Sequence, residues 1–428
     1  MRLNELKSAI LNDALQLYSN IYKDTEAQKE RVLSLIDAFG EKYGADREVF
    51  LLSVPGRSEI CGNHTDHNCG CAIAGAIDRD IIAIAARNEE NTIRLTSVGY
   101  YESVVKLSEV KSSENFKKFN SRALIGGVAA GFINCGYRVG GFDAYTTSDV
   151  LKGSGLSSSA AFEVMIGNAL NHLYNDGKID GVSLAKIARY AENEYFGKPC
   201  GLLDQIAAAV GGFVYIDFEN TDEPCVIPID FSLKGAGYSL CIVNTGGSHS
   251  DLNEEYALIP REMKAVANAL GASVLREVEE EKLLNALPGL RENLGDRAVL
   301  RALHFFAENK RVGEMKDALL RRDMSGVIAA SLASGVSSAT YLQNVYTPRS
   351  VKEQGITLAL ALANGYINDR LKDKQASLRV HGGGFAGTAQ IILPTEEVEA
   401  FCEYMDSFFG KGAAMALNVR PIGACRLF

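Results

Sequence analysis

Residues 150–161, VLKGSGLSSSAA, constrain the fold of this chain more than any other segment. They lead from a predicted strand, FDAYTTSDV, into a predicted helix, SSSAAFEVMIGNALNHLY, and contain two glycines and four serines. Glycines let backbone amides approach an anion closely, and a helix start presents unpaired N–H groups with partial positive charge. We therefore expect an anion site at Gly153, Ser154, Gly155, Leu156, Ser157, Ser158 and Ser159. The simpler alternative is that Ser157 only caps the helix.

Two common nucleotide-binding patterns do not fit this chain. It contains no GxxxxGK[ST] sequence, which argues against a P-loop protein. Residues 382–387, GGGFAG, match GxGxxG, but a predicted strand follows them instead of a helix. About 40 residues remain after this turn, too few for a dinucleotide-binding half. A Rossmann fold is therefore not expected.

The order of predicted elements indicates the fold class. Strands and helices are mixed without strict alternation, which favours α+β over a doubly wound parallel sheet. The length of 428 residues is enough for two or three domains, and no repeat or low-complexity linker divides the chain. The pattern changes after FVYIDFE, so we expect one domain over residues 1–222 and a second over residues 223–428.

Charge and segment composition narrow the location and the partners. A net charge of −9 gives no broad cationic surface, which disfavours nucleic acid as a partner. The first 23 residues alternate apolar and charged side chains at helical spacing, which predicts an amphipathic surface helix and not a signal peptide. No run approaches the roughly 20 apolar residues of a membrane span. Nine cysteines without CxxC spacing favour reduced thiols, and the cytoplasm is the expected location.

A polar loop lies between two predicted strands, at residues 54–70, VPGRSEICGNHTDHNCG. Arg57, His64, Asp66 and Asn68 gather hydrogen-bonding groups where rigid strands can hold them. As a set they predict a site for sugar hydroxyls, while any one of them would also fit an Asx turn. Zinc at His64 and His67 is disfavoured, because no further ligand stands at standard spacing.

A third segment, residues 191–205, AENEYFGKPCGLLDQ, places two carboxylates around a Gly-Pro-Gly turn. Glu192 lies near the end of one predicted helix and Asp204 at the start of the next. Such a pair can serve one cavity, one carboxylate for a metal and one for a proton. Asp204 would equally fit a helix dipole partner, and the residues alone leave both readings open.

Together the three segments resemble the signature motifs of the GHMP kinase superfamily, and within it the galactokinase family. That family carries PGRxNLIGEHTDYNxG, GLSSSA, PCGxxDQ and GGGFGG in this order. The chain reads PGRSEICGNHTDHNCG, GLSSSA, PCGLLDQ and GGGFAG at the same places. The resemblance implies a two-domain α+β fold, with a left-handed βαβ unit in the N-terminal domain and a ferredoxin-like C-terminal domain.

The resemblance also implies an activity and roles for single residues. It implies transfer of the γ-phosphoryl group of ATP to the anomeric hydroxyl of galactose, with Asp204 as catalytic base and Arg57 stabilising the transferring charge. The implied sugar contacts are Asn63, His64, Asp66, Gly201 and Tyr256. The implied Mg²⁺ ligands are Glu192 with Ser158 or Ser159, and the backbone from Gly153 to Ser159 would hold the phosphates. We expect a monomer or a small homo-oligomer.

The chain departs from the family pattern mainly at Asn63, where the family has glutamate. A neutral residue there leaves two alternatives open. The first is a 1-kinase for a related sugar, such as N-acetylgalactosamine, arabinose or a uronic acid. The second is a non-catalytic sensor of sugar and ATP, which the complete serine turn and the presence of Arg57 and Asp204 disfavour.

Overall fold

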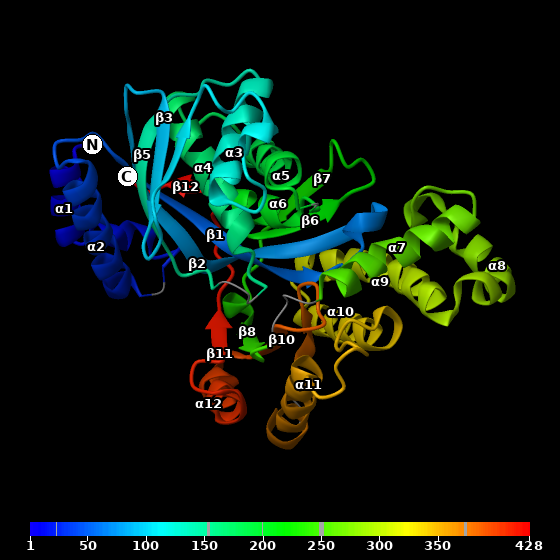
Figure 1. Ribbon diagram of the computed structural model, residues 1–428. Coiled ribbons are helices and arrows are strands. Elements are labelled where there is room, and N and C mark those ends of the chain that lie inside the picture. Colours follow the sequence, from blue (N-terminus) through cyan, green and yellow to red (C-terminus); the bar gives the residue numbers. More distant parts are fainter. Residues whose placement is uncertain (23, 152–154, 199, 248–251, 372–374) are drawn as a thin grey trace.

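The computed structural model describes residues 1–22, 24–151, 155–198, 200–247, 252–371 and 375–428. Its strands form two sheets, one of eight strands and one of four (Figure 1). The mixed α+β class predicted from the sequence is confirmed. None of the helices in these ranges combines the length and the apolar character that a membrane crossing needs.

The larger sheet has the order β12-β1-β2-β5-β3-β4, and in addition β6 pairs with β2 and β7 pairs with β6. Most of its pairs are antiparallel, but β3 and β5 are parallel, with α3 in the connection between them. The two strands predicted on either side of the polar loop and the strand predicted at residues 142–150 are confirmed as β1, β2 and β5. The strands are β1 (Phe50–Cys61), β2 (Cys71–Arg87), β3 (Thr92–Ser97), β4 (Ser103–Lys106), β5 (Phe142–Ser148), β6 (Phe213–Asp217), β7 (Cys225–Ile229) and β12 (Cys425–Arg426).

Neighbouring residues of β2 face opposite sides of this sheet and pack against different helices. Ile82 and Ile84 belong to an apolar cluster with α1 (Leu3–Leu11) and α2 (Thr25–Tyr43). Ile81 and Ala83 belong to the main core. That core includes helices from the other side of the sheet (Figure 1), namely α3 (Ser121–Asn134), α4 (Ser158–Tyr174), α5 (Gly181–Tyr190) and α6 (Leu203–Val210). Because both faces are covered, the first residues of β1 and both ends of β2 are largely apolar and buried.

The N-terminal helix is shorter than predicted. It ends at Leu11, and Asp13 then adopts a left-handed backbone with φ of 59° before a short 3-10 turn, Ala14–Tyr18. Its apolar stripe, Leu3, Leu6 and Ile10, is buried in the cluster with α2. The amphipathic pattern was therefore a correct sign of a helix with one buried face.

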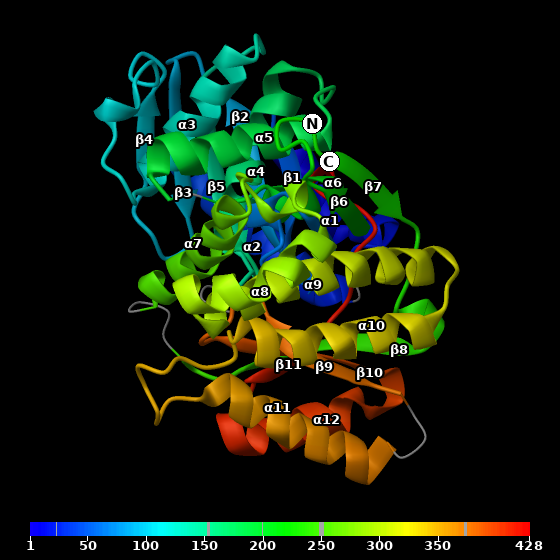
Figure 2. The ribbon, with the colours of Figure 1, turned by 90° about the vertical axis from the view of Figure 1, so that its right-hand side faces the viewer.

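The smaller sheet has the order β11-β8-β10-β9, and its chain order is strand, helices, two strands, helix, strand. This arrangement is the ferredoxin-like topology implied by the resemblance. Its strands are β8 (Tyr238–Asn244), β9 (Ser377–His381), β10 (Thr388–Pro394) and β11 (Ala414–Leu417). On one face lie α11 (Gly355–Tyr366) and α12 (Val398–Phe409), and on the other lies α10 (Met324–Ser337), as Figure 2 shows.

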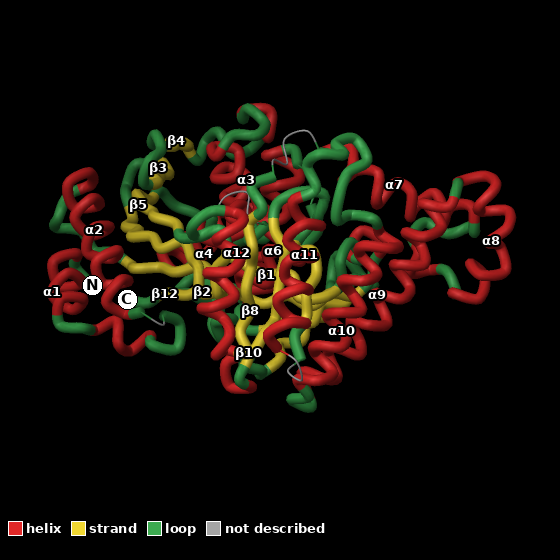
Figure 3. The backbone as a smooth tube through the Cα atoms, turned by 90° about the horizontal axis from the view of Figure 1, so that it is seen from below, coloured by secondary structure: helices red, strands yellow, loops and turns green. Residues whose placement is uncertain are grey.

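Three further helices follow β8 and extend to one side. They are α7 (Asn253–Ala269), α8 (Glu280–Leu294) and α9 (Asp296–Leu320). Their apolar faces form a cluster of their own, and α8 lies at the opposite end of the molecule from α1 and α2 (Figure 3). The middle of α9 reaches the larger sheet, where Glu308 contacts the backbone that follows β1.

The two sheets do not divide the chain strictly at residue 222. Strand β7 pairs with β6, and β12 pairs with β1, so both belong to the larger sheet although they lie beyond that boundary. The chain returns to this sheet through a bridge between Ile77 and Val419 and through Arg420, which is buried and paired with Asp80 at 3.2 Å. The division into residues 1–222 and 223–428 remains a prediction, with these two strands on the far side of it.

Candidate active site

Three segments far apart in the sequence meet at Asp204. Arg57 on β1 pairs with its carboxylate, with Nε 2.5 Å from Oδ1, and Arg57 Nη1 donates to the carbonyl of Gly155. The hydroxyl of Ser157 donates to Oδ2 of the same carboxylate. The Arg57 side chain is 9% exposed and that of Asp204 34%. The cation therefore lies beneath the carboxylate, and the carboxylate remains accessible.

The charge state of Asp204 follows from these partners. Burial raises the pKa of its carboxyl, but the Arg57 guanidinium and the hydrogen bonds from Arg57 and Ser157 outweigh burial. The pKa therefore lies below its ordinary value, and the group is a carboxylate at neutral pH. This carboxylate can accept a proton or a hydrogen bond on the side that faces solvent.

The serine turn has the backbone that its glycines and serines predicted. Gly155 and Ser157 have φ of 71° and 56°, and α4 begins at Ser158 directly afterwards. Ser157 makes no side-chain cap bond, since its hydroxyl is directed to Asp204. The alternative of a simple helix cap is therefore wrong. Ser158 and Ser159 are half-buried in the first turn of α4, whereas Gly153 and Ser154 lie outside the described residues.

His381, at the end of β9, fixes the serine turn against the smaller sheet. A side chain at Gly155 would lie 3.0 Å from its Nδ1. Its ring nitrogens are 2.9 Å from the hydroxyls of Ser58 and Thr388. This histidine, which directly precedes the GGGFAG turn, therefore holds the turn between β9 and β10 next to the serine turn.

The polar loop after β1 approaches the segment that precedes Asp204. Its Asp66 faces Gly201, so closely that a side chain at Gly201 would overlap Asp66 Oδ2. His64 Nε2 is 3.0 Å from the carbonyl of Gly383. Burial, and then the neighbouring His67, lower the pKa of His64, so its ring is neutral at neutral pH and donates through Nε2.

Tyr256 on α7 contacts the same glycine turn. Its hydroxyl donates to the carbonyl of Gly384 at 2.7 Å, and its ring packs edge-on against Phe385 with centroids 5.4 Å apart. Of the predicted sugar residues, His64 and Tyr256 therefore contact the same glycine turn, and Asp66 lies against Gly201.

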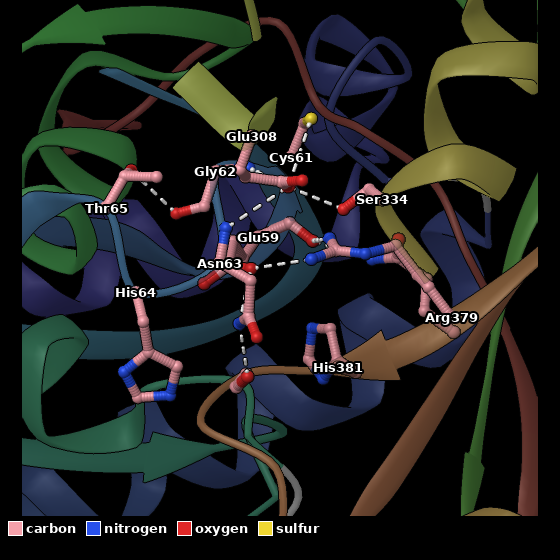
Figure 4. A network of polar contacts seen from close by, with 12 residues as sticks. Glu59, Cys61, Gly62, Asn63, His64, Thr65, Glu308, Ser334, Arg379 and His381 are labelled. Carbon is pink, nitrogen blue, oxygen red and sulfur yellow. Dashed lines mark hydrogen bonds and ion pairs between the residues drawn. The ribbon is translucent and has the colours of Figure 1, made fainter. Parts of the chain in front are cut away.

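Asn63 differs from the prediction of a sugar contact. It is completely buried, and its amide nitrogen donates to Glu59 Oε1 at 2.9 Å and to the carbonyl of Gly382 at 2.8 Å (Figure 4). Its amide oxygen accepts from Asn344 at 2.7 Å. Because protein groups use the whole amide, Asn63 lies behind the site and not in its wall.

Glu192 lies in a buried carboxylate pair on the side of α4. It accepts from Gln205 at 3.0 Å and pairs with Lys198 at 3.2 Å. Gln205 also donates to Glu163 at 3.3 Å, and Glu163 Oε1 has no hydrogen-bond partner among the described residues. Burial, and then the charge of Glu192, raise the pKa of Glu163.

Two helical residues at the site were not predicted from the sequence. On α9, Glu308 accepts from the backbone amide of Gly62 at 3.0 Å, and His304 Nε2 is 2.9 Å from the carbonyl of Asn63. Their spacing of four residues on a helix was the available signal, because it places both side chains on one face. That face is fully buried, and it holds the backbone of the polar loop.

The same segments of the chain match known protein families. Residues 123–212 match the model of the GHMP kinases N terminal domain, and residues 37–87 match the galactokinase galactose-binding signature. A galactokinase of Streptomyces coelicolor is 31% identical over 385 residues, covering 90% of this chain and 94% of the relative. A galactokinase of Glaesserella parasuis is 30% identical and covers 84% and 88%.

Among solved structures, the Lactococcus lactis galactokinase complexed with galactose superposes with a TM-score of 0.76 at 22% identity. It covers 92% of this chain and all of that one. The Methanococcus jannaschii mevalonate kinase gives a TM-score of 0.59 at 15% identity, covering 87% and 98%. At these identities the likeness is one of fold.

Proposed function

The chain belongs to the galactokinase family of the GHMP kinase superfamily, and we propose that it transfers the γ-phosphoryl group of ATP to the anomeric hydroxyl of galactose. The observation that carries this proposal is the meeting of Arg57, Asp204 and the serine turn at one accessible carboxylate. The galactose-binding match over residues 37–87 supports the sugar.

In the proposed reaction the oxygen at C1 of the sugar attacks the γ-phosphorus. A bond forms between that oxygen and phosphorus, the bond from the γ-phosphorus to its bridging oxygen breaks, and ADP leaves. The proton of the hydroxyl passes to Asp204, which is ionised at neutral pH. Arg57 stabilises the negative charge that develops near the carboxylate, as cations do in phosphoryl transfer.

The serine turn and α4 supply the proposed nucleotide site. Backbone amides at the start of α4 are unpaired helix-end donors suited to the phosphates. The proposal extends this site to Gly153 and Ser154. Half-buried Ser158 and Ser159 would supply hydroxyls next to those phosphates.

The residues around Glu192 fit Mg²⁺. Its carboxylate, the serine hydroxyls and the unpartnered Oε1 of Glu163 are hard oxygen donors, the kind that Mg²⁺ prefers. Glu192 with Ser158 or Ser159 would hold the ion, which when bound would neutralise phosphate charge. The chain itself contributes the buried carboxylate and fixes it through Gln205 and Lys198.

For the sugar, the proposal assigns contacts to Asp66, His64, Gly201 and Tyr256. Asp66 is an accessible acceptor beside Gly201, and Gly201 leaves room that any side chain would fill. His64 and Tyr256 are tied to carbonyls of the glycine turn and so give this wall a fixed shape. The proposal also includes a cytoplasmic location. It includes no nucleic-acid partner, because a net charge of −9 disfavours binding to phosphate backbones.

The test is an ATP-dependent assay with galactose that detects α-galactose 1-phosphate, together with Asp204→Asn. If Asp204 is the base, the variant loses at least about 100-fold in kcat, the lower end of general-base contributions. An unfolding measurement serves as control, since amide and carboxylate are nearly isosteric. Turnover close to the wild-type value in Asp204→Asn would remove this residue from the mechanism.

One observation favours a second candidate of the same class. Asn63 stands where the family pattern has glutamate, and it supports the glycine turn that His64 and Tyr256 contact. A 1-kinase for N-acetylgalactosamine, arabinose or a uronic acid is therefore the alternative. A panel of these sugars compared by kcat/KM decides, and a low rank for galactose would overturn the first proposal.

A further inference from the structure

Behind the proposed sugar site lies a buried charge pair that neither the nucleotide nor the sugar contacts explain. Arg379 on β9 is fully buried, and its guanidinium is 2.9 Å from Oε1 of Glu59 on β1. Arg379 also donates to the backbone carbonyl of Glu59 at 3.1 Å. The pair joins the larger sheet to the smaller one.

Asn63 connects this pair to the glycine turn. Its amide nitrogen bonds both Glu59 Oε1 (Figure 4) and the carbonyl of Gly382. Its amide oxygen accepts from Asn344. Asn344 in turn donates to the carbonyl of Gly383 at 3.1 Å. The glycine turn is therefore held by a chain of hydrogen bonds that runs from the buried Glu59 carboxylate through Asn63 and Asn344.

The glycine turn carries two of the proposed sugar residues. His64 bonds the carbonyl of Gly383, and Tyr256 bonds that of Gly384. A shift of the turn would move both rings. Gly384 leaves little freedom for such a shift, because its backbone packs against Asn344 so tightly that a side chain there would overlap it.

We propose that Glu59 and Asn63 act together as a positioning pair for the sugar site. The carboxylate of Glu59 pairs with Arg379, and the amide of Asn63 links that carboxylate to the glycine turn. The role in sugar binding rests on the proposed function, whereas the contacts among these residues do not. Neither residue is a catalytic residue, since both act through the turn.

The positioning role can be tested by exchanging the residues at positions 59 and 63. The family pattern has Asn at position 59 and Glu at position 63, whereas this chain has the reverse. Asn63→Glu alone would place a second carboxylate beside Glu59. Glu59→Asn alone would leave Arg379 buried without its carboxylate, which is costly in a protein interior. The double exchange restores one carboxylate and one amide.

The experiment measures KM and kcat for galactose, and thermal unfolding without ligand, for both single variants and the double. We expect each single variant to raise KM about 10-fold with kcat less affected, and the double to recover most of that loss, as contacting residues do. If one of the single variants does not fold, Asn63→Ala replaces it, because this substitution adds no charge. We expect Asn63→Ala to raise KM about 10-fold as well.

Asp143→Asn is the matched control. Asp143 is a buried carboxylate on β5 that pairs with Arg47 at 3.1 Å and Arg94 at 2.9 Å, and it has no contact with the site residues above. We expect it to lower the unfolding temperature without changing KM. If the Asn63 variants behave like this control, the positioning role is refuted although the kinase proposal stands.

The two proposals fail in different ways. If the wild type does not phosphorylate galactose, the proposed function fails, while the unfolding temperatures of the four proteins still report whether residues 59 and 63 are coupled. If the single effects simply add in the double variant, in both KM and unfolding temperature, the pair is refuted.

Discussion

Glu308→Gln tests whether a single buried carboxylate on α9 holds the loop of the proposed sugar site. Glu308 is fully buried. Its Oε1 accepts from the Gly62 amide at 3.0 Å and from the Ser334 hydroxyl at 2.5 Å, and its Oε2 accepts from Arg311 at 2.8 Å. Glutamine keeps the shape and one acceptor oxygen but loses the charge.

The magnitude follows from the pKa of Glu308. Burial raises it, but His304, Arg311 and Arg379 together with the hydrogen bond from Ser334 outweigh burial and lower it from 4.5 to about 2. A folded pKa below the unfolded value means that the carboxylate stabilises the protein above pH 4.5. That contribution disappears as the pH falls toward about 2. By linkage it amounts to about 3 kcal/mol at neutral pH, similar to the loss on breaking a buried ion pair.

Urea unfolding of the wild type and the variant measures this contribution. At pH 7 we expect the free energy of unfolding to be lower by about 3 kcal/mol in Glu308→Gln, with a constant difference from about pH 6 to 8. Below about pH 4.5 the difference should narrow, because the Glu308 carboxyl is then protonated in the unfolded wild type while it stays ionised in the folded protein. Glu314→Gln, an exposed position on the same helix, is the control and should show no deficit. A deficit under about 1 kcal/mol at pH 7, or one that stays constant down to pH 3.5, would refute the reasoning.

Two further predictions concern the site itself. Gly201→Ala places a Cβ on Asp66 Oδ2, so we expect KM for galactose to rise about 10-fold while unfolding hardly changes. Gly289→Ala, where the added atom meets open space, is the control, and an unchanged KM in Gly201→Ala would contradict the proposed role of Asp66. Ser157→Gly suits the left-handed backbone but removes a hydrogen bond that lowers the pKa of Asp204. The acidic limb of its kcat/KM profile should therefore move to higher pH, and a limb that stays in place would show that Asp204 does not control it.

Local patterns in the sequence predicted most of the secondary structure. The segments rich in Ile, Val and Leu on either side of the polar loop became β1 and β2, and the glycine-rich but apolar segment 121–134 became α3. The prediction was less accurate where the cause was not local. The N-terminal helix ends at Leu11, and β12 joins the larger sheet although it is more than 300 residues away from its partner. Pairing between distant segments leaves no periodic signal in either of them.

The functional residues divide in the same way. Resemblance to family motifs brought Arg57, Asp204 and the serine turn together, and the structure has them in contact. The same resemblance implied that Asn63 contacts the sugar, whereas its side chain is buried and hydrogen-bonded to Asn344. A motif identifies a position, but the direction of a side chain depends on the partners that surround it.

The sequence by itself determined most of the elements and the glycine- and serine-rich turn that we propose as the phosphate site, because helix, strand and glycine-turn preferences act over a few neighbouring residues. Only the tertiary structure decided what lies behind the site, where Glu59, Arg379 and Glu308 come from three distant elements. Their burial is tolerable only when opposite charges and donors meet them. That condition is met by packing, which no single stretch of the chain encodes.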